Sequence, residues 1–224
     1  MSTIHELHVP APPTRKARVR FPNSSYTKAG RYFRAYAEEM TLAASSIDAA
    51  SLDSAAKILL TAYTSGARVF ACGNGGSAAI ANHLACDHVK GVRTATDLAP
   101  RVVSLSASVE LITAIANDMA YQDVFVYQLQ SQSAPGDVLI AVSSAGRSPN
   151  IVRSLTWARE HGIRTIALTG FDGGEASAIA EVTIHVNGTN YGIVEDLHQA
   201  IAHCLAQYIR QSRMTEDAIS AGVF

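Results

Sequence analysis

Two short turns of this 224-residue chain carry the residue types that bind phosphate groups. The glycine turn, residues 73–77, reads Gly-Asn-Gly-Gly-Ser between an apolar run and a helical pattern. Glycines adopt backbone angles closed to other residues, and a helix N-terminus presents N–H groups and a positive dipole to an anion. The serine turn, residues 143–148, reads Ser-Ser-Ala-Gly-Arg-Ser and leads into a helix whose first turn tolerates Pro149. The two turns predict a pair of anion cradles and a phosphorylated small molecule as their ligand.

A histidine and a carboxylate lie on the helix that the glycine turn opens. His83 and Asp87 are four residues apart in the sequence, so they share one face of that helix. Such a pair is a usable half of a metal site. It is equally an ordinary surface contact between helix neighbours, and these two residues alone leave both interpretations open.

Other uses of a glycine turn fit this sequence less well. The turn lacks the Gly-Lys-Ser/Thr ending of a P-loop, and with Ala78 in its last position it matches the dinucleotide fingerprint only in part. The acidic residue about twenty positions further on, Asp97, lies in a predicted loop and not at the end of a strand. A dinucleotide is therefore a poor alternative. A tight turn that serves packing alone is another, since serine is also a favoured helix cap.

Strands alternate with helices along most of the chain. Helical periodicity extends from residue 26 to residue 66. Five strand-like runs follow, with helical patterns between them, at residues 68–72, 101–105, 138–142, 165–169 and 182–186. This alternation predicts an α/β fold with a parallel sheet covered on both faces. Ligands of such sheets bind at the carboxyl ends of the strands, which is where both turns lie.

Composition limits the class of protein. Because the net charge is −1 and no basic stripe is present, we expect no nucleic-acid partner. The longest apolar runs are strand-sized and the N-terminus has no apolar signal core, so we expect a cytoplasmic protein without membrane contact. Three widely spaced cysteines indicate reduced thiols, interpreted as small buried hydrophobic residues. The proline-rich basic residues 1–25 predict a flexible arm, and residues 26–224 a single domain.

Several motifs match one known family. They lie at residues 72–79, 82–85, 111–118, 143–148, 167–170 and 195–198, with His203 beyond them. Over about residues 30–212 the chain resembles the SIS (sugar isomerase) domain and, within it, the phosphoheptose isomerases. The resemblance implies a three-layer α/β/α sandwich of flavodoxin-like type with leading N-terminal helices. It also implies a homotetramer with active sites at the subunit interfaces.

The implied activity is an aldose–ketose isomerisation of a phosphorylated sugar. In the family, sedoheptulose 7-phosphate is converted into a heptose 7-phosphate through an enediol. Two alternatives come from the same family or fold: a non-catalytic protein that binds a protein partner, like a regulator of replication initiation, and a sensor of a sugar phosphate. Four groups that could bind metal or transfer protons favour the enzyme.

The resemblance also assigns the site residues. Asp87 and His203 would exchange the proton, and a divalent metal would be bound by His83, Asp87, Glu195 and His203. Zinc is the first expectation for this ligand set, which also accepts manganese or iron. Since eight helical residues rise about 12 Å, Glu195 and His203 could meet one ion only at the level of Gln199. The residues expected to bind substrate are Asn74, Gly75, Gly76, Ser77, Ser108, Ser143, Ser144, Ala145, Ser148 and Glu195.

The chain departs from the family at several of these positions. Asp87 stands in place of a glutamate, Glu195 in place of a glutamine and Ser108 in place of an aspartate. In the serine turn, Ala145 replaces a hydroxyl residue, and Arg147 replaces an asparagine and could bring a positive charge to the phosphate. These changes concern the identity of the sugar more than the fold.

Overall fold

The computed structural model of the protein describes residues 21–222 and Phe224. Residues 1–20 of the expected flexible arm lie outside the described residues. Residues 21–25 differ from the expectation, because Phe21 is buried and its ring packs against those of Tyr26, Tyr32 and Tyr36. The aromatic contacts attach this segment to the start of the first helix, so the described fold begins before residue 26.

The described residues form a five-stranded parallel sheet, as the alternation of patterns predicted. The order in the sheet is β2-β1-β3-β4-β5, the flavodoxin-like order. The strands are β1 (Arg68–Gly73), β2 (Arg101–Ser104), β3 (Val138–Ser143), β4 (Arg164–Thr169) and β5 (Val182–His185). Each agrees within one residue at either end with its predicted run.

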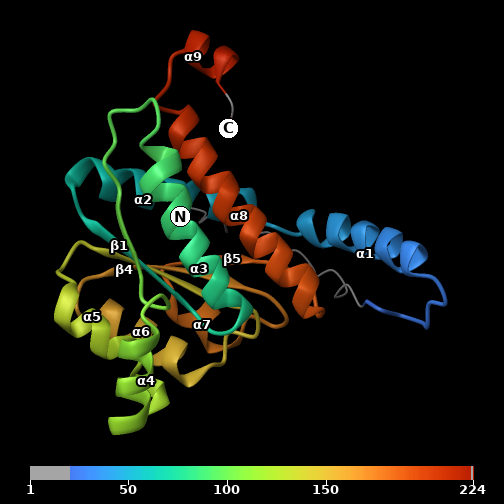
Figure 1. Ribbon diagram of the computed structural model, residues 1–224, viewed down its shortest axis with the longest axis horizontal. Helices are drawn as coiled ribbons and strands as arrows, with labels where there is room; N and C mark the ends of the chain where they lie inside the picture. The colour runs from blue at the N-terminus through green and yellow to red at the C-terminus, as the bar shows by residue number, and fades with distance from the viewer. Residues whose placement is uncertain (1–20, 223) are drawn as a thin grey trace, which may run out of the picture.

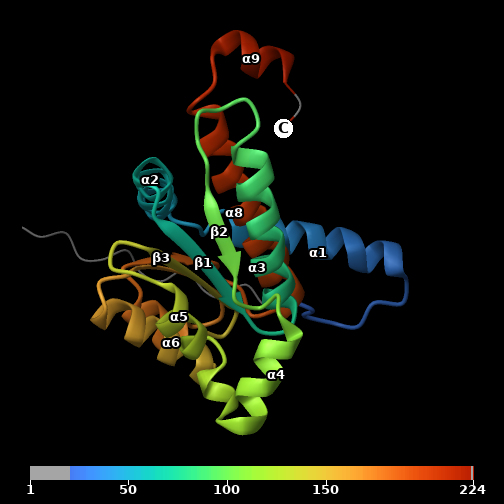
Figure 2. The ribbon, with the colours of Figure 1, turned by 60° about the vertical axis from the view of Figure 1, so that its left-hand side comes forward.

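Helices cover both faces of the sheet, which gives the three layers expected from the resemblance (Figures 1 and 2). One face is covered by α2 (Ala49–Ser65), α3 (Gly76–Cys86) and α8 (Tyr191–Gln211). The other is covered by α4 (Val109–Asp118), α5 (Val126–Gln132), α6 (Pro149–Glu160) and α7 (Gly174–Ile179). The leading helix α1 (Ala29–Ala44) contacts α8 and projects away from the sheet, and α9 (Glu216–Ala221) lies beyond the end of α8. No helix of the described part is long and apolar enough to span a bilayer.

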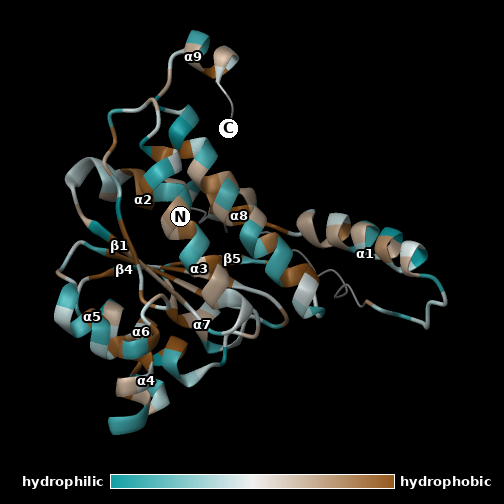
Figure 3. Cartoon of the chain, in the orientation of Figure 1, coloured by the Kyte–Doolittle hydropathy of each residue, from teal (hydrophilic) through white to brown (hydrophobic). Residues whose placement is uncertain are grey.

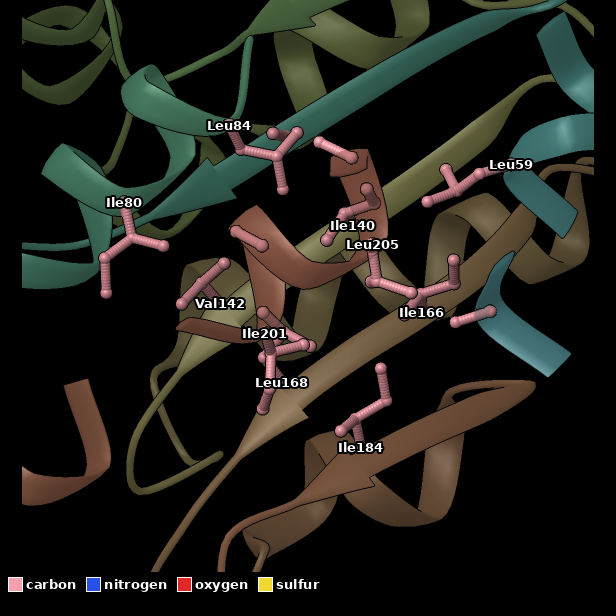
Figure 4. Packing of buried hydrophobic residues seen from close by; sticks show 14 of the residues in the cluster. Leu59, Ile80, Leu84, Ile140, Val142, Ile166, Leu168, Ile184, Ile201 and Leu205 are labelled. Atoms are coloured by element: carbon pink, nitrogen blue, oxygen red, sulfur yellow. The ribbon is translucent and has the colours of Figure 1, made fainter. Parts of the chain in front are cut away.

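The core consists of two apolar clusters, one on each side of the sheet. Alternate residues of β1 serve opposite faces: Val69 and Ala71 pack under α2, α3 and α8, and Phe70 and Cys72 pack under α4 to α7. Figure 4 shows the first cluster, and Figure 3 shows that the central strands are hydrophobic. All three cysteines are free thiols. Only Cys72 fulfils the expectation of burial, because Cys86 and Cys204 lie on exposed positions of α3 and α8.

The glycine turn brings α3 unusually close to the end of β1. A Cβ atom at residue 73 would overlap the backbone carbonyl group of Ser77 in the first turn of α3. Gly75, which precedes α3, has a φ of +55°, a region that glycine adopts without strain. The turn therefore needs glycine for close backbone approach and for its dihedral angles.

We expect Gly73→Ala to lower the free energy of unfolding by about 1–3 kcal/mol, because the added methyl group has no space beside Ser77. Urea denaturation monitored by circular dichroism measures the change. Gly30→Ala is the matched control, since nothing lies within 4 Å of a Cβ there. An equal loss in both variants would contradict the steric explanation.

His198 makes stability depend on pH. This residue of α8 is fully buried, and burial lowers the pKa of its imidazole to about 4. Between pH 6.5 and pH 4, His198 binds a proton in the unfolded chain but not in the folded chain. The contribution of His198 therefore destabilises the fold as pH falls through this window.

We expect His198→Leu to flatten the pH dependence of the unfolding free energy between pH 6.5 and 4. One fewer coupled proton reduces the slope by up to about 1.4 kcal/mol per pH unit. Urea unfolding at pH 7, 5.5 and 4.5 provides the slopes of both proteins. Identical slopes would show that His198 binds protons equally in the folded and unfolded states over this range, which would contradict a lowered pKa.

Candidate functional site

The glycine and serine turns meet at the point where the sheet reverses its order. The chain leaves β1 toward one edge, at β2, and leaves β3 toward the other, at β4, so a crevice opens between the carboxyl ends of β1 and β3. Asn74 and Asn150 bridge the crevice with two reciprocal amide hydrogen bonds, each 2.9 Å long. The Tyr121 hydroxyl donates to the same Asn74 oxygen at 2.9 Å. Sequence reasoning missed Asn150 and Tyr121, since neither carries a pattern that points to the glycine turn.

The serine turn retains polar groups suited to an anion. The Ser144 hydroxyl is buried and has no hydrogen-bond partner among the described residues. Ser148 precedes α6 as its N-cap, yet its side chain makes no capping bond. Ser143 instead accepts a hydrogen bond from the N–H of Gly146. Because buried hydroxyl groups are normally hydrogen-bonded, Ser144 fits a ligand oxygen in this position.

A small cavity joins the two turns. Its volume is about 170 Å³. Most of the expected substrate-binding residues line it: Asn74, Ser77, Ser143, Ser144, Ala145, Ser148 and Glu195. Gly75 and Gly76 lie in the sequence between the lining residues Asn74 and Ser77, and a Cβ at Gly76 would collide with the Glu195 carboxylate. The structure thus brings Glu195 next to the predicted phosphate cradle, which is formed by residues 73–77 and 143–148.

Two expected contributors lie elsewhere. Ser108 is the N-cap of α4, where its hydroxyl accepts the N–H of Leu111 and donates to Glu110, and it does not line the cavity. Arg147 forms an ion pair with Asp172, and this guanidinium lowers the pKa of the Asp172 carboxyl. The positive charge that was expected to reach the phosphate is therefore directed at a carboxylate in this structure.

A second polar group lies at the far end of α3. The Nε2 atom of His83 is 3.2 Å from Oδ1 of Asp87, and Nδ1 of His203 on α8 is 2.8 Å from Oδ2. The two imidazole rings meet edge to face at 4.9 Å. One potential ligand atom from each of the three residues lies within 4.8 Å of the others. The i, i+4 pairing of His83 with Asp87 and the approach of His203 were both expected.

The donor set of this group fits a divalent cation. Oδ2 of Asp87 is buried but forms no hydrogen bond within the described residues, so its approach to His203 is close without an aligned donor. Two imidazole nitrogens and a carboxylate are ligands for zinc. At Asp87 the α-helix gives way to a π-helical segment, Asp87–Val92, an irregularity that is often found at functional sites.

Glu195 does not join this group. It lies two turns before His203 on α8, beside Gly76 and Ser77. At the intervening level, where the two ligands would have to converge, Gln199 places its amide nitrogen 3.0 Å from Nε2 of His203. Three of the four expected metal ligands are therefore brought together within the chain, and the fourth lies with the cradle.

A cavity larger than the one between the two turns opens on Asp87 and His203. It has a volume of about 440 Å³, within the range of small-molecule sites. Asp87 and His203 form part of its wall together with Lys90, Arg210 and Phe224. Phe224 comes from the end of the chain, and its ring lies 4.8 Å from the Arg210 guanidinium. The two polar groups, one at the start of α3 and one at its end, thus each open on a cavity.

The chain was compared with known proteins. Residues 31–170 match the model of the SIS domain family. The phosphoheptose isomerase of Akkermansia muciniphila is 35% identical over 73% of this chain and 86% of its own length, and that of Geobacter sp. strain M21 is 33% identical over 80% and 92%. Among solved structures, a phosphoheptose isomerase from Neisseria gonorrhoeae superposes with a TM-score of 0.75 and 29% identity, over 82% of this chain and all of the other.

We expect the protein to bind one zinc ion per chain and Asp87→Asn to weaken the binding more than about tenfold, because the central ligand is lost. Glu195→Gln should leave the zinc affinity within about threefold of wild type, since this side chain lies outside the group. Isothermal titration calorimetry provides both constants. An equal loss in the two variants would show that Glu195 reaches the ion in solution.

Proposed function

Because this chain belongs to the SIS domain family and, within it, to the phosphoheptose isomerases, we propose that it interconverts an aldose and a ketose of a phosphorylated sugar. Sedoheptulose 7-phosphate is the substrate we favour. The observation that supports the proposal best is the group of His83, Asp87 and His203, which opens on the larger cavity. A binding protein would need the phosphate cradle but not this group.

The reaction requires a base and an acid at adjacent carbons. In the proposed direction, Asp87 removes a proton from C1 of the ketose, and the electron pair forms the C1–C2 double bond while the C2 oxygen takes up a proton. His203 is the group placed to give that proton and to take the one from the C1 hydroxyl. Return of a proton to C2 then yields the aldose. Positioned acid–base groups of this kind contribute about 10²–10⁴-fold to a rate.

A divalent metal fits beside these groups. His83, Asp87 and His203 would hold it, and zinc is the ion we favour. When bound, such an ion polarises the carbonyl oxygen and stabilises negative charge on the enediol oxygens. Glu195, the fourth expected ligand, stays with the phosphate cradle in this proposal, where its carboxylate can accept hydroxyl groups of the sugar.

The separation of the two ends suits a long sugar. Ser77 and Asp87 lie ten residues apart along α3 and its continuation, which corresponds to a rise of about 15 Å. A phosphosugar held by Ser77, Ser144 and Ser148 must therefore be extended for its reacting carbons to approach Asp87, as a seven-carbon chain can be.

We further propose a homotetramer in the cytoplasm, with active sites at the subunit interfaces. The projecting helix α1 supports the assembly, because Phe33 and Leu42 on it are 69% and 58% exposed. Large apolar side chains on a projecting helix are typical of surfaces that another chain covers. Three free thiols are consistent with a reducing compartment.

We expect the purified protein to convert sedoheptulose 7-phosphate into an aldose phosphate and Asp87→Asn to lower kcat by about 10²–10⁴-fold, because the amide cannot accept the proton. A coupled colorimetric assay with and without chelator measures turnover and its dependence on metal.

Asp97→Asn is the matched control, since Asp97 pairs with Arg213 at the surface and should retain full activity. A folded protein that binds sedoheptulose 7-phosphate without turnover would be a sensor. Absence of both binding and turnover would exclude this substrate.

A further inference from the structure

His203 is contacted at both of its ring nitrogens. Nδ1 approaches Oδ2 of Asp87 at 2.8 Å, and Nε2 lies 3.0 Å from the side-chain amide nitrogen of Gln199. Gln199 precedes His203 by one turn of α8, so the two side chains share a helix face. The two contacts therefore involve different nitrogens of the same ring.

The ring contact with His83 does not define the direction of the His203 ring. His83 meets His203 edge to face at 4.9 Å, a contact that is similar whether a nitrogen or a carbon of the ring faces Asp87. The side chain of His203 is also 42% exposed, so surrounding packing leaves it room to turn. The Asp87 contact is close but not aligned as a hydrogen bond, so the amide of Gln199 forms the hydrogen bond that distinguishes one ring flip from the other.

A side-chain amide can hold an imidazole in either neutral form. In the first form, the NH₂ group of the amide donates to an unprotonated Nε2, and the ring proton is on Nδ1. In the second form, the amide oxygen accepts a hydrogen bond from a protonated Nε2, and Nδ1 carries a lone pair. The first form supplies an acid at Nδ1 and the second supplies a metal ligand or a base. In both forms Nδ1 is the atom that faces Asp87.

We propose that Gln199 is a positioning residue of the site: it binds Nε2 of His203 so that Nδ1 is the nitrogen presented to Asp87 and the larger cavity. The inference deepens the proposed function, and it rests on that function only for its effect on turnover. The hydrogen bond and the orientation of the ring follow from the contacts of this chain.

Carbethoxylation with diethyl pyrocarbonate tests the contact without reference to activity. Each variant is treated in the presence of chelator, and the modified histidines are located by peptide mass spectrometry. In Gln199→Leu, the freed ring should react about fivefold faster at His203, the effect of losing one hydrogen bond, while His83 reacts at the wild-type rate. Gln199→Glu should stay near the wild-type rate, because its carboxylate accepts a hydrogen bond from Nε2.

Gln211→Leu is the matched control, since it makes the same change about three turns further along α8 and should alter neither rate. The proposal is overturned if His203 in Gln199→Leu reacts at the wild-type rate. It is also overturned if His83 and His203 accelerate together, because that result indicates general loosening of the site.

Zinc affinity and turnover provide a second measurement. We expect Gln199→Leu to weaken zinc binding about tenfold, as loss of a hydrogen bond to the second nitrogen of a ligating histidine does, and Gln199→Glu to restore it. Turnover should fall in kcat with little change in KM, since Gln199 does not touch the cradle. If no ketose phosphate is converted but the labelling pattern holds, the isomerase assignment fails and the role of Gln199 stands.

Discussion

Helices α3 and α8 lie side by side on one face of the sheet, and their contact determines where the reactive side chains meet (Figure 1). α3 contributes His83 and Asp87, and α8 contributes His203 from more than a hundred residues further along the chain. Buried aliphatic residues of both helices pack onto the same strands (Figure 4). Because that packing is close, a shift of either helix along its axis would separate the imidazole from the carboxylate.

The two ends of α3 offer a ligand different kinds of groups. At its start, the groups available to an anion are backbone N–H groups and hydroxyls, since Arg147, the cation of the serine turn, is paired with Asp172. At its end, titratable side chains converge on one carboxylate whose Oδ2 atom is buried. A phosphate keeps its charge throughout an isomerisation and needs only a fixed cradle. The reacting carbons need groups that can change their protonation.

The periodicity of the chain was sufficient to predict the parallel sheet, because buried parallel strands appear as short apolar runs such as residues 138–142. Local spacing also predicted that His83 and Asp87 share a face. The roles of Ser108 and Glu195 could not be predicted from sequence, since a capping hydroxyl and a binding hydroxyl look alike. Whether a carboxylate on α8 lies beside His83 and Asp87 or beside the cradle depends on the position of α8 along its axis relative to α3. Gln199 and Asn150 carried no signal, because an amide gains a role only from the neighbour that tertiary packing supplies.

The close contact between Gly76 and the Glu195 carboxylate also concerns how this protein can change over evolutionary time. Any side chain at position 76 would make the Glu195 carboxylate move, and because this carboxylate ends a flexible side chain, the substitution would alter the cradle rather than the fold. The two positions are far apart in the sequence, yet a change at one alters the position of the other's side chain. Members of the family that differ at position 195 should accordingly reveal, in the residue at position 76, whether the cradle of each has been rebuilt for another sugar.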